Sequence, residues 1–160
     1  MNTAESIFRQ MTEHALLAED CAQNNRTGGY FCISPKTSTR TNGLTVQAIG
    51  TPNPVKADLQ AAFCREKVLR LMSHPEHDLS FQSRDVQPGR DVKQNKYGGA
   101  VRGNCWVVSL SGLPEKADEI FSYAFLLSIG DLTRFQVEAM LVKYPNEYQE
   151  VLWSLELHAA

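Results

Sequence analysis

The stretch Lys96–Asp118, KYGGAVRGNCWVVSLSGLPEKAD, decides how this chain folds. The pair Gly98-Gly99 permits a tight turn or a close approach of the backbone, because glycine tolerates positive φ. The run Trp106–Leu110 is rich in β-branched and aromatic residues, which is typical of a buried strand. The segment Ser111–Pro114 ends that strand, and its proline suits the first position of a helix. The stretch therefore predicts a turn, a strand, a second turn and a helix.

Upstream of this stretch, the apolar pattern predicts a helix followed by a hairpin. Residues 3–24 carry apolar side chains at three- and four-residue intervals, which favours one amphipathic helix. Two β-prone runs, 30–34 and 44–49, flank a polar turn and predict two paired strands.

A second helix and a third strand are expected before the paired glycines. The helix is predicted from Pro54 to about Ser73, since Asn53 offers a capping side chain. Its buried residues are expected to be Leu59, Ala62, Phe63 and Leu69. Residues 78–83 are expected to form a strand, and 84–95 a polar loop that is either a lid or merely disordered.

Short amphipathic helices are predicted at 132–144 and 146–158, split by Pro145. The order of helices and strands predicts an α+β domain with an antiparallel sheet of about five strands and helices packed on it.

Composition limits the class of protein. The 160 residues suffice for one domain, and the net charge of -2 gives no general attraction to nucleic acid or to an anionic membrane. The sequence has no apolar run of about 20 residues, and its first residues lack the basic start and apolar run of a secretory signal, so no secretory leader is expected. Its four cysteines lack a CxxC pair, so reduced thiols in the cytoplasm are expected, with Cys105 buried in a strand.

Charge is spread unevenly along the chain. Five basic residues lie between Arg84 and Arg102, whereas eight carboxylates follow Leu113. This pattern fits either charge-complementary self-association or two solvated faces.

Three segments resemble the GlcG-like family, also called the haem-degrading-domain family. They are Cys64–Leu71 with its basic pair, Tyr97–Ala100 with its paired glycines, and Val108–Pro114 followed by Asp118. The likeness is closest to a branch with an SGLP turn and covers roughly residues 3–130. It implies a profilin-like fold, with a GlcG-like domain over 1–131 and a C-terminal helical extension, 132–160, packed on the same domain.

The resemblance also implies a non-enzymatic ligand-binding or accessory protein. Members of this family include haem-binding proteins and neighbours of corrinoid enzymes, and they commonly assemble into homo-oligomers. By this likeness the chain would form a homo-oligomer and bind an acidic small molecule, such as haem or a carboxylate metabolite. The identity of the ligand, the size of the oligomer and the presence of any catalysis stay open.

The SGLP turn is the predicted binding site. Pro114 at the first helical position would make Leu113 the cap, and leucine offers no acceptor to the free N–H groups of the first turn. The resemblance places Arg65 and Lys67 nearest the pocket, where they would hold a carboxylate. The other predicted ligand-binding residues are Gly98, Gly99, Ser111, Gly112 and Pro114. A self-satisfied turn and a solvated helix face are the alternatives.

Histidines offer a second candidate chemistry. A haem-handling or redox enzyme of the same fold would need an axial ligand, and His14 on the first helix is the candidate. An ordinary hydrogen-bonded histidine is the alternative. His74 and His77 flank Pro75, so their segment is expected to be a loop and no metal site is predicted there.

Other enzyme classes and nucleic-acid binding find little support. The sequence has no GxSxG, Walker or dinucleotide motif, and its basic segment holds one aromatic residue. A third hypothesis is a structural or partner-binding oligomer that docks through the acidic helices at 132–158. The side chains available for docking are Phe135, Leu141, Tyr148, Leu152, Trp153 and Leu155. The alternative is that they pack on the protein's own core or a sister subunit.

Overall fold

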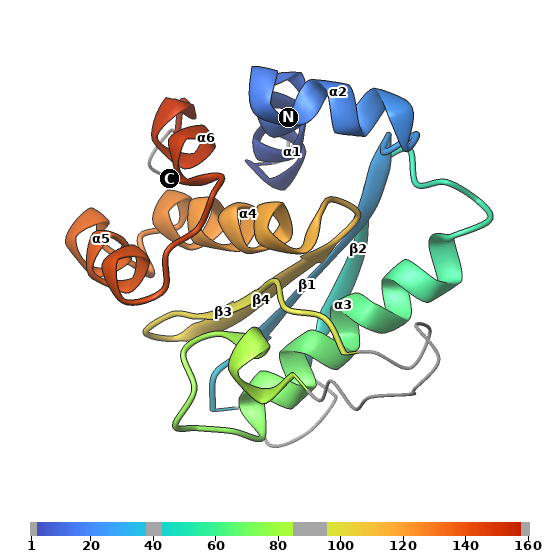
Figure 1. Cartoon of the computed structure of the whole chain (residues 1–160). Helices are drawn as coiled ribbons and strands as arrows, with labels where there is room; N and C mark the ends of the chain where they lie inside the picture. The colour runs from blue at the N-terminus through green and yellow to red at the C-terminus, as the bar shows by residue number, and fades with distance from the viewer. Residues whose placement is uncertain (1–2, 38–42, 85–95, 158–160) are drawn as a thin grey trace.

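A computed structural model describes residues 3–37, 43–84 and 96–157 (Figure 1). In chain order its elements are α1 (Thr3–Glu13), α2 (Ala15–Gln23), β1 (Gly28–Pro35), β2 (Thr45–Gly50), α3 (Ala57–Met72), the 3-10 helix η2 (Ser80–Ser83), β3 (Ala100–Arg102), β4 (Trp106–Ser111), α4 (Glu115–Ser128), α5 (Arg134–Lys143) and α6 (Gln149–Ser154). The predicted loop at 84–95 lies, apart from Arg84, outside the described residues.

The strands form one antiparallel sheet in the order β2-β1-β4-β3. β1 pairs with β2 in the predicted hairpin, and on its other side with β4, so that Phe31 lies between Gln47 and Leu110. The α+β class is therefore confirmed. The predicted number of strands is wrong, because the described residues form four rather than five.

The strand predicted at 78–83 is absent from the sheet. Residues 80–83 form η2, and Leu79 alone makes a bridge to Val101. The reason is local: Gln82 Oε1 accepts the N–H groups of both Asp78 and Leu79, each at 2.9 Å. The backbone N–H groups of Asp78 and Leu79, which a strand could donate to a neighbouring strand, therefore already have an acceptor.

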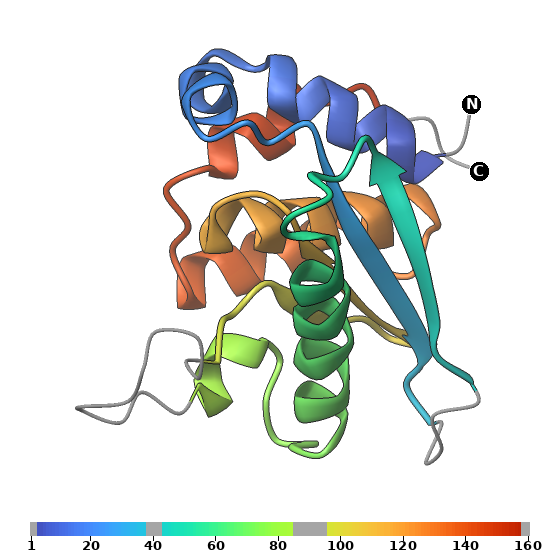
Figure 2. The same ribbon diagram turned by 90° about the vertical axis from the view of Figure 1, so that its right-hand side faces the viewer.

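Helices cover both faces of the sheet (Figure 2). On one face α3 packs Cys64, Val68 and Leu71 against the inward residues of β1 and β4. On the other face α4 and α1 build the larger core around Phe31 and Phe121. Successive residues of β1 and β4 alternate between these two cores, as the period of a strand requires.

The predicted first helix is two helices. α1 ends at Glu13 and α2 starts at Ala15, with His14 between them in an extended conformation. His14 Nδ1 accepts the N–H of Leu16 at 3.2 Å, so the histidine is the N-cap of α2. The apolar period alone could not reveal this break, because Leu17 and Cys21 continue the buried pattern.

The predicted buried face of α3 is wrong. Leu59 is 47% exposed and Ala62 is also exposed, while Lys67 and Arg70 are buried. Apolar side chains occur on more than one side of this helix, and the buried side of the helix is the one that also carries the two cations, Lys67 and Arg70. Those cations tolerate burial because both have hydrogen-bond partners.

The C-terminal helices share the core of the domain. Val137, Leu141, Val151 and Leu152 belong to the same cluster as Phe121. This packing follows the own-core alternative for Leu141 and Leu152. Phe135 and Trp153 are exposed, and the Arg134 guanidinium lies 4.6 Å from the centre of the Trp153 ring.

All four cysteines are free thiols. Burial raises the pKa of Cys64 well above its usual value, so this thiol stays protonated and unreactive. The expectation that Cys105 is buried is wrong, because it lies exposed before β4, where Asp131 Oδ1 accepts its N–H at 2.9 Å. Within the described ranges, no helix has both the length and the apolar character that crossing a bilayer requires.

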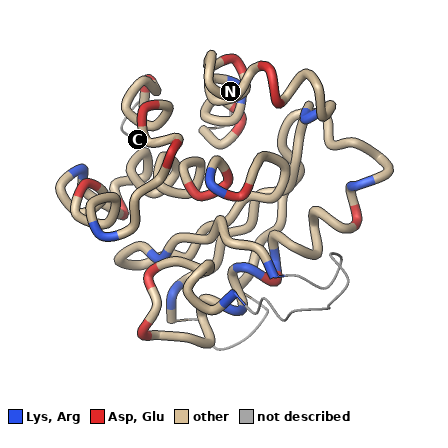
Figure 3. Tube along the Cα trace, in the orientation of Figure 1, with Lys and Arg blue, Asp and Glu red and all other residues tan. Residues whose placement is uncertain are grey.

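The helices differ in the balance of their charges (Figure 3). α3 carries more basic than acidic side chains, whereas α1, α2 and α4 carry more acidic ones. Most of the basic segment between Arg84 and Arg102 lies outside the described residues, and charge-complementary self-association stays a prediction.

Candidate functional site

The SGLP turn connects β4 to α4, and a carboxylate in the first turn of α4 accepts a hydrogen bond from the turn. β4 ends at Ser111, Pro114 is the N-cap, and α4 begins at Glu115, one residue later than predicted. Asp118 Oδ1 accepts the N–H of Leu113 at 2.9 Å. No described hydrogen bond uses the N–H of Glu115 or Lys116, so the start of α4 keeps two open donors.

A buried ion pair lies directly behind this turn. Lys67 Nζ of α3 lies 2.8 Å from Asp118 Oδ2 of α4, and the two side chains are 2% and 4% exposed. Lys67 Nζ also donates to the carbonyl of Leu110 at 2.8 Å. Burial raises the pKa of Asp118 to about 6, although the charge and hydrogen bond of Lys67 act in the opposite direction. The pair joins α3, the end of β4 and α4.

Gly99 makes room for this ion pair, and Gly98 makes room for the side chain of Glu115. Gly99 has φ +118°, and a Cβ there would lie 2.8 Å from Asp118 Cβ and 3.1 Å from Lys67 Nζ. A Cβ on Gly98 would lie 2.6 Å from Glu115 Oε1, which accepts the Gly98 N–H at 2.7 Å. Both glycines therefore approach the protein's own side chains closely, whereas the sequence suggested an approach to a ligand.

Gly112 has a similar structural role. A Cβ there would lie 2.9 Å from both the carbonyl oxygen of Gly28 and the Cα of Gly29, so the turn crosses the start of β1 at backbone contact. Arg26 Nη1 donates to the carbonyl of Gly112 at 3.3 Å, while its Nε pairs with Asp20 at 2.6 Å. These contacts bring Arg26 to the SGLP turn.

A cavity of about 420 Å³ opens beside the turn. Four of the predicted site residues line it: Lys67, Ser111, Gly112 and Pro114. The lining residues that sequence reasoning missed are Arg26, Lys56, Leu59, Gln60, Phe63, Tyr97, Leu113, Glu115 and Asp118. The downstream acid of the SGLP motif was a usable signal for Asp118, but Arg26 and Lys56 arrive through tertiary structure alone.

The residues that line the cavity include the cations Arg26 and Lys56 and a hydrogen-bond acceptor, the Gln60 side-chain oxygen. Lys56 is exposed and has no ion-pair partner among the described residues. The charge of Glu115 is balanced by Arg84, whose Nη1 lies 2.8 Å from Glu115 Oε2. Gln60 Oε1 is buried and accepts no hydrogen bond within the described ranges. The site can therefore hold an anionic group and also offer an acceptor to a ligand N–H or O–H.

Arg65 lies outside this cavity. It lines a second hollow of about 680 Å³ along α3, together with His74 and Lys96. Residues two apart on a helix point to different sides, so Arg65 and Lys67 cannot hold one carboxylate together. Arg70 is also committed elsewhere, because it pairs with Glu66 and donates to the carbonyl of Ser80.

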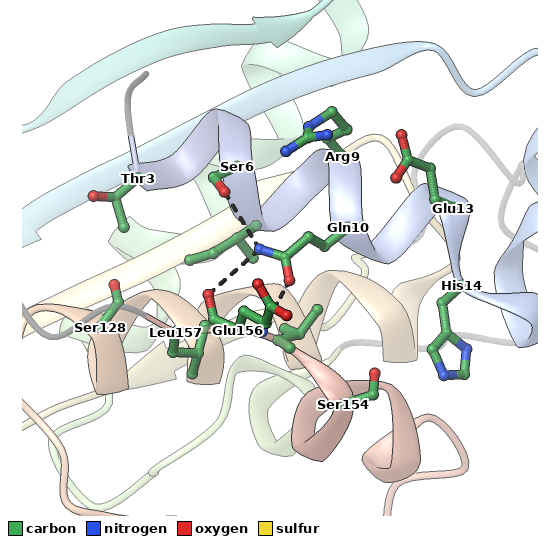
Figure 4. A pocket seen from close by; sticks show the side chains of 12 residues that line it. Thr3, Ser6, Arg9, Gln10, Glu13, His14, Ser128, Ser154, Glu156 and Leu157 are labelled. Carbon is green, nitrogen blue, oxygen red and sulfur yellow. Dashed lines mark hydrogen bonds between the residues drawn. The ribbon is translucent and has the colours of Figure 1, made fainter.

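Among the described residues, His14, His74 and His77 do not come together in one site. His14 lies at one end of a third cavity, about 740 Å³, between α1 and residues 154–157 (Figure 4). Its Nδ1 accepts a hydrogen bond, which places the proton of the neutral ring on Nε2, the atom that an axial ligand would present to iron. The rings of His74 and His77 stack with centroids 5.2 Å apart. The described residues contain no group of three metal-ligating side chains.

Comparison with known proteins adds no relative. No protein-family model matches the sequence, and neither the curated proteins nor the solved structures contain a significant match. The resemblance to the GlcG-like family therefore stays a prediction, and the function has to be argued from the cavity beside the SGLP turn.

Proposed function

We propose that the chain is a non-enzymatic binding module that holds a small acidic molecule in the cavity beside the SGLP turn. The carrying observation is the meeting of two cations, Arg26 and Lys56, with the open start of α4 at one cavity of about 420 Å³. A carboxylate placed there would gain charge-assisted hydrogen bonds from the cations and from free backbone donors. The volume suits a metabolite-sized ligand.

Several ionisable side chains described around the cavity are engaged in ion pairs within the protein, which supports binding rather than catalysis. Lys67 and Asp118 line the cavity and pair with each other, and the Glu115 carboxylate pairs with Arg84. The Cys64 thiol, which packs in the core between α3 and the sheet, is kept protonated by burial. An arrangement that holds its ionisable groups in structural bonds is suited to recognition.

The GlcG-like family and its profilin-like fold are part of this proposal. An antiparallel sheet with α3 on one face and α4 on the other accords with that architecture. The resemblance rests in part on the basic pair of α3 and on the acid downstream of the SGLP turn. In this proposal, the structural role of Lys67 and Asp118 is to form their buried ion pair. Haem handling is not advanced, because His14 is oriented as a helix cap.

The docking role is not advanced either. Leu141 and Leu152, two of its predicted contact residues, are buried in the chain's own core. The exposed remainder, with Phe135 and Trp153, has no recess among the cavities described above.

Thermal unfolding with a panel of small mono- and dicarboxylates tests the binding proposal. We expect at least one carboxylate to raise the Tm of the unchanged protein, as a ligand of the folded state must. Lys56→Ala should remove most of that shift. Arg65→Ala is the matched control, since it deletes an exposed cation of α3, the helix that Lys56 precedes, outside the cavity. Equal loss in both variants, or no shift with any carboxylate, would contradict the proposal.

A further inference from the structure

The segment Ser154–Leu157 lies against α1 and is held there through its backbone (Figure 4). The N–H of Glu156 donates to Gln10 Oε1 at 2.9 Å, and Gln10 Nε2 donates to the carbonyl of Glu156 at 3.5 Å. One amide side chain thus engages both backbone groups of a single residue. Pairing of this kind recognises the peptide chain, because the Glu156 side chain itself stays exposed.

The two leucines on either side of Glu156 supply apolar contacts. Leu155 and Leu157 are partly buried and pack against the main core. The N–H of Leu157 donates to the carbonyl of Leu155 at 3.1 Å, so the three residues form a tight turn centred on Glu156. The turn leaves the N–H and carbonyl of Glu156 available to Gln10. The recognised pattern is therefore Leu-x-Leu with a solvent-facing middle residue.

The receiving surface on α1 is built independently of this segment. Ile7 and Met11 of α1 are buried in the core, and the Glu5 carboxylate accepts the N–H of Gly50 at 3.1 Å. Gln10 Nε2 also donates to Ser6 Oγ at 3.3 Å, which orients its amide. α1 would keep Gln10 in position if the segment left.

The segment fills its groove incompletely. A cavity of about 740 Å³ remains between α1 and residues 154–157. Figure 4 shows Thr3, Ser6 and Gln10 in a row along α1, facing Ser128 and Leu157. The segment is thus held by Gln10 and two half-buried leucines, whereas residues of the core are closely packed.

We propose that this groove is a binding site for short Leu-x-Leu peptide segments, and that residues 155–157 occupy it as a displaceable internal ligand. The partner is a peptide with one leucine on each side of a solvent-facing residue, and the chain's own segment is the observed example. The groove shares no lining residue with the cavity beside the SGLP turn, so the two proposals stand or fall separately.

Fluorescence anisotropy with a labelled peptide of the sequence of residues 154–160 tests the proposal. The full chain with Leu155→Ser and Leu157→Ser should bind this peptide at least about tenfold more tightly than the unchanged chain, because its own segment competes less. Adding Gln10→Ala should abolish the binding. Gln23→Ala is the matched control, since the hydrogen bond described for its side chain goes to the exposed Glu19 of the same helix, α2. A peptide with both leucines replaced by serine should not bind.

Hydrogen exchange at Glu156 gives a second readout that needs no substitution in the segment itself. Excess peptide should accelerate exchange of the Glu156 amide by displacing the segment, and Gln10→Ala should accelerate it without peptide. The proposal is overturned if the folded serine variant fails to bind, if binding survives Gln10→Ala, or if excess peptide leaves Glu156 exchange unchanged.

Discussion

Lys67 and Asp118 form the buried ion pair beside the candidate site, and the charge of each is engaged by the other rather than free for a ligand. Removing both charges from water is expensive, and their contact at 2.8 Å offsets that penalty only while both partners are present. Asp118 also accepts the N–H of Leu113, so the pair shapes the SGLP turn. Both residues belong to the segments that carry the family resemblance. The resemblance predicted that Lys67 contacts a ligand, and the sequence could not show that the Lys67 ammonium is already paired with Asp118.

Removing one partner of this pair should destabilise the protein strongly. We expect Asp118→Ala to lower the free energy of unfolding by about 3–5 kcal/mol, because Lys67 is left charged and buried. The double variant Lys67→Met with Asp118→Leu should recover much of this loss. Urea unfolding followed by circular dichroism measures both effects, with Arg65→Ala as an exposed control on the same helix. A single variant as stable as Arg65→Ala would show that the pair is not buried.

The pair should also make stability depend on pH. The pKa of Asp118 is raised by burial from 3.8 to about 6 in the folded protein. Between these values the folded state keeps a proton that the unfolded state has lost, so the contribution of Asp118 is full below pH 3.8 and declines as the pH rises through about 6. A carbon NMR titration of the Asp118 carboxyl should therefore have its midpoint near pH 6. A midpoint at the ordinary value of an aspartate would contradict this account.

At the scale of elements, local patterns predicted some segments well and others poorly. The hairpin, β4 and α4 follow from strand-like runs, turn residues and a helix-starting proline, which are local signals. The break at His14 and the η2 helix depend on single side-chain hydrogen bonds from His14 and Gln82. Periodicity does not register such bonds, and it also misassigned the buried side of α3, where partners rather than hydrophobicity decide burial.

The turn before β3 provides a test at this scale. Gly99 and Gly130 both have positive φ, but a Cβ on Gly130 would meet nothing within 4 Å, whereas one on Gly99 would meet Asp118. Gly99→Ala should therefore lower the free energy of unfolding by about 1–3 kcal/mol more than Gly130→Ala, because it adds overpacking to a shared backbone strain. Chemical unfolding of the two variants measures the difference. Equal losses would mean that α3 and α4 do not approach as closely at this turn.

For the whole molecule, the sheet decides which residues meet at the cavity. Arg26 precedes β1, Lys56 precedes α3 and Lys67 lies within α3, and the antiparallel order brings all three to the SGLP turn at the end of β4. No local pattern relates Arg26 to a turn far along the chain, so these cations could not be found from sequence. The SGLP turn itself was found because its proline and glycine are local features. Assembly into a homo-oligomer stays a prediction.

Native mass spectrometry of the protein as purified, with no ligand added, tests the central claim most directly. We predict a stoichiometric additional mass of a small acidic molecule, lost in Lys56→Ala and retained in the control Arg65→Ala. The same spectrum reports whether the chain forms a homo-oligomer. An additional mass that survives Lys56→Ala and disappears in Arg65→Ala would contradict the claim, since it would place the ligand in the hollow along α3 rather than beside the SGLP turn.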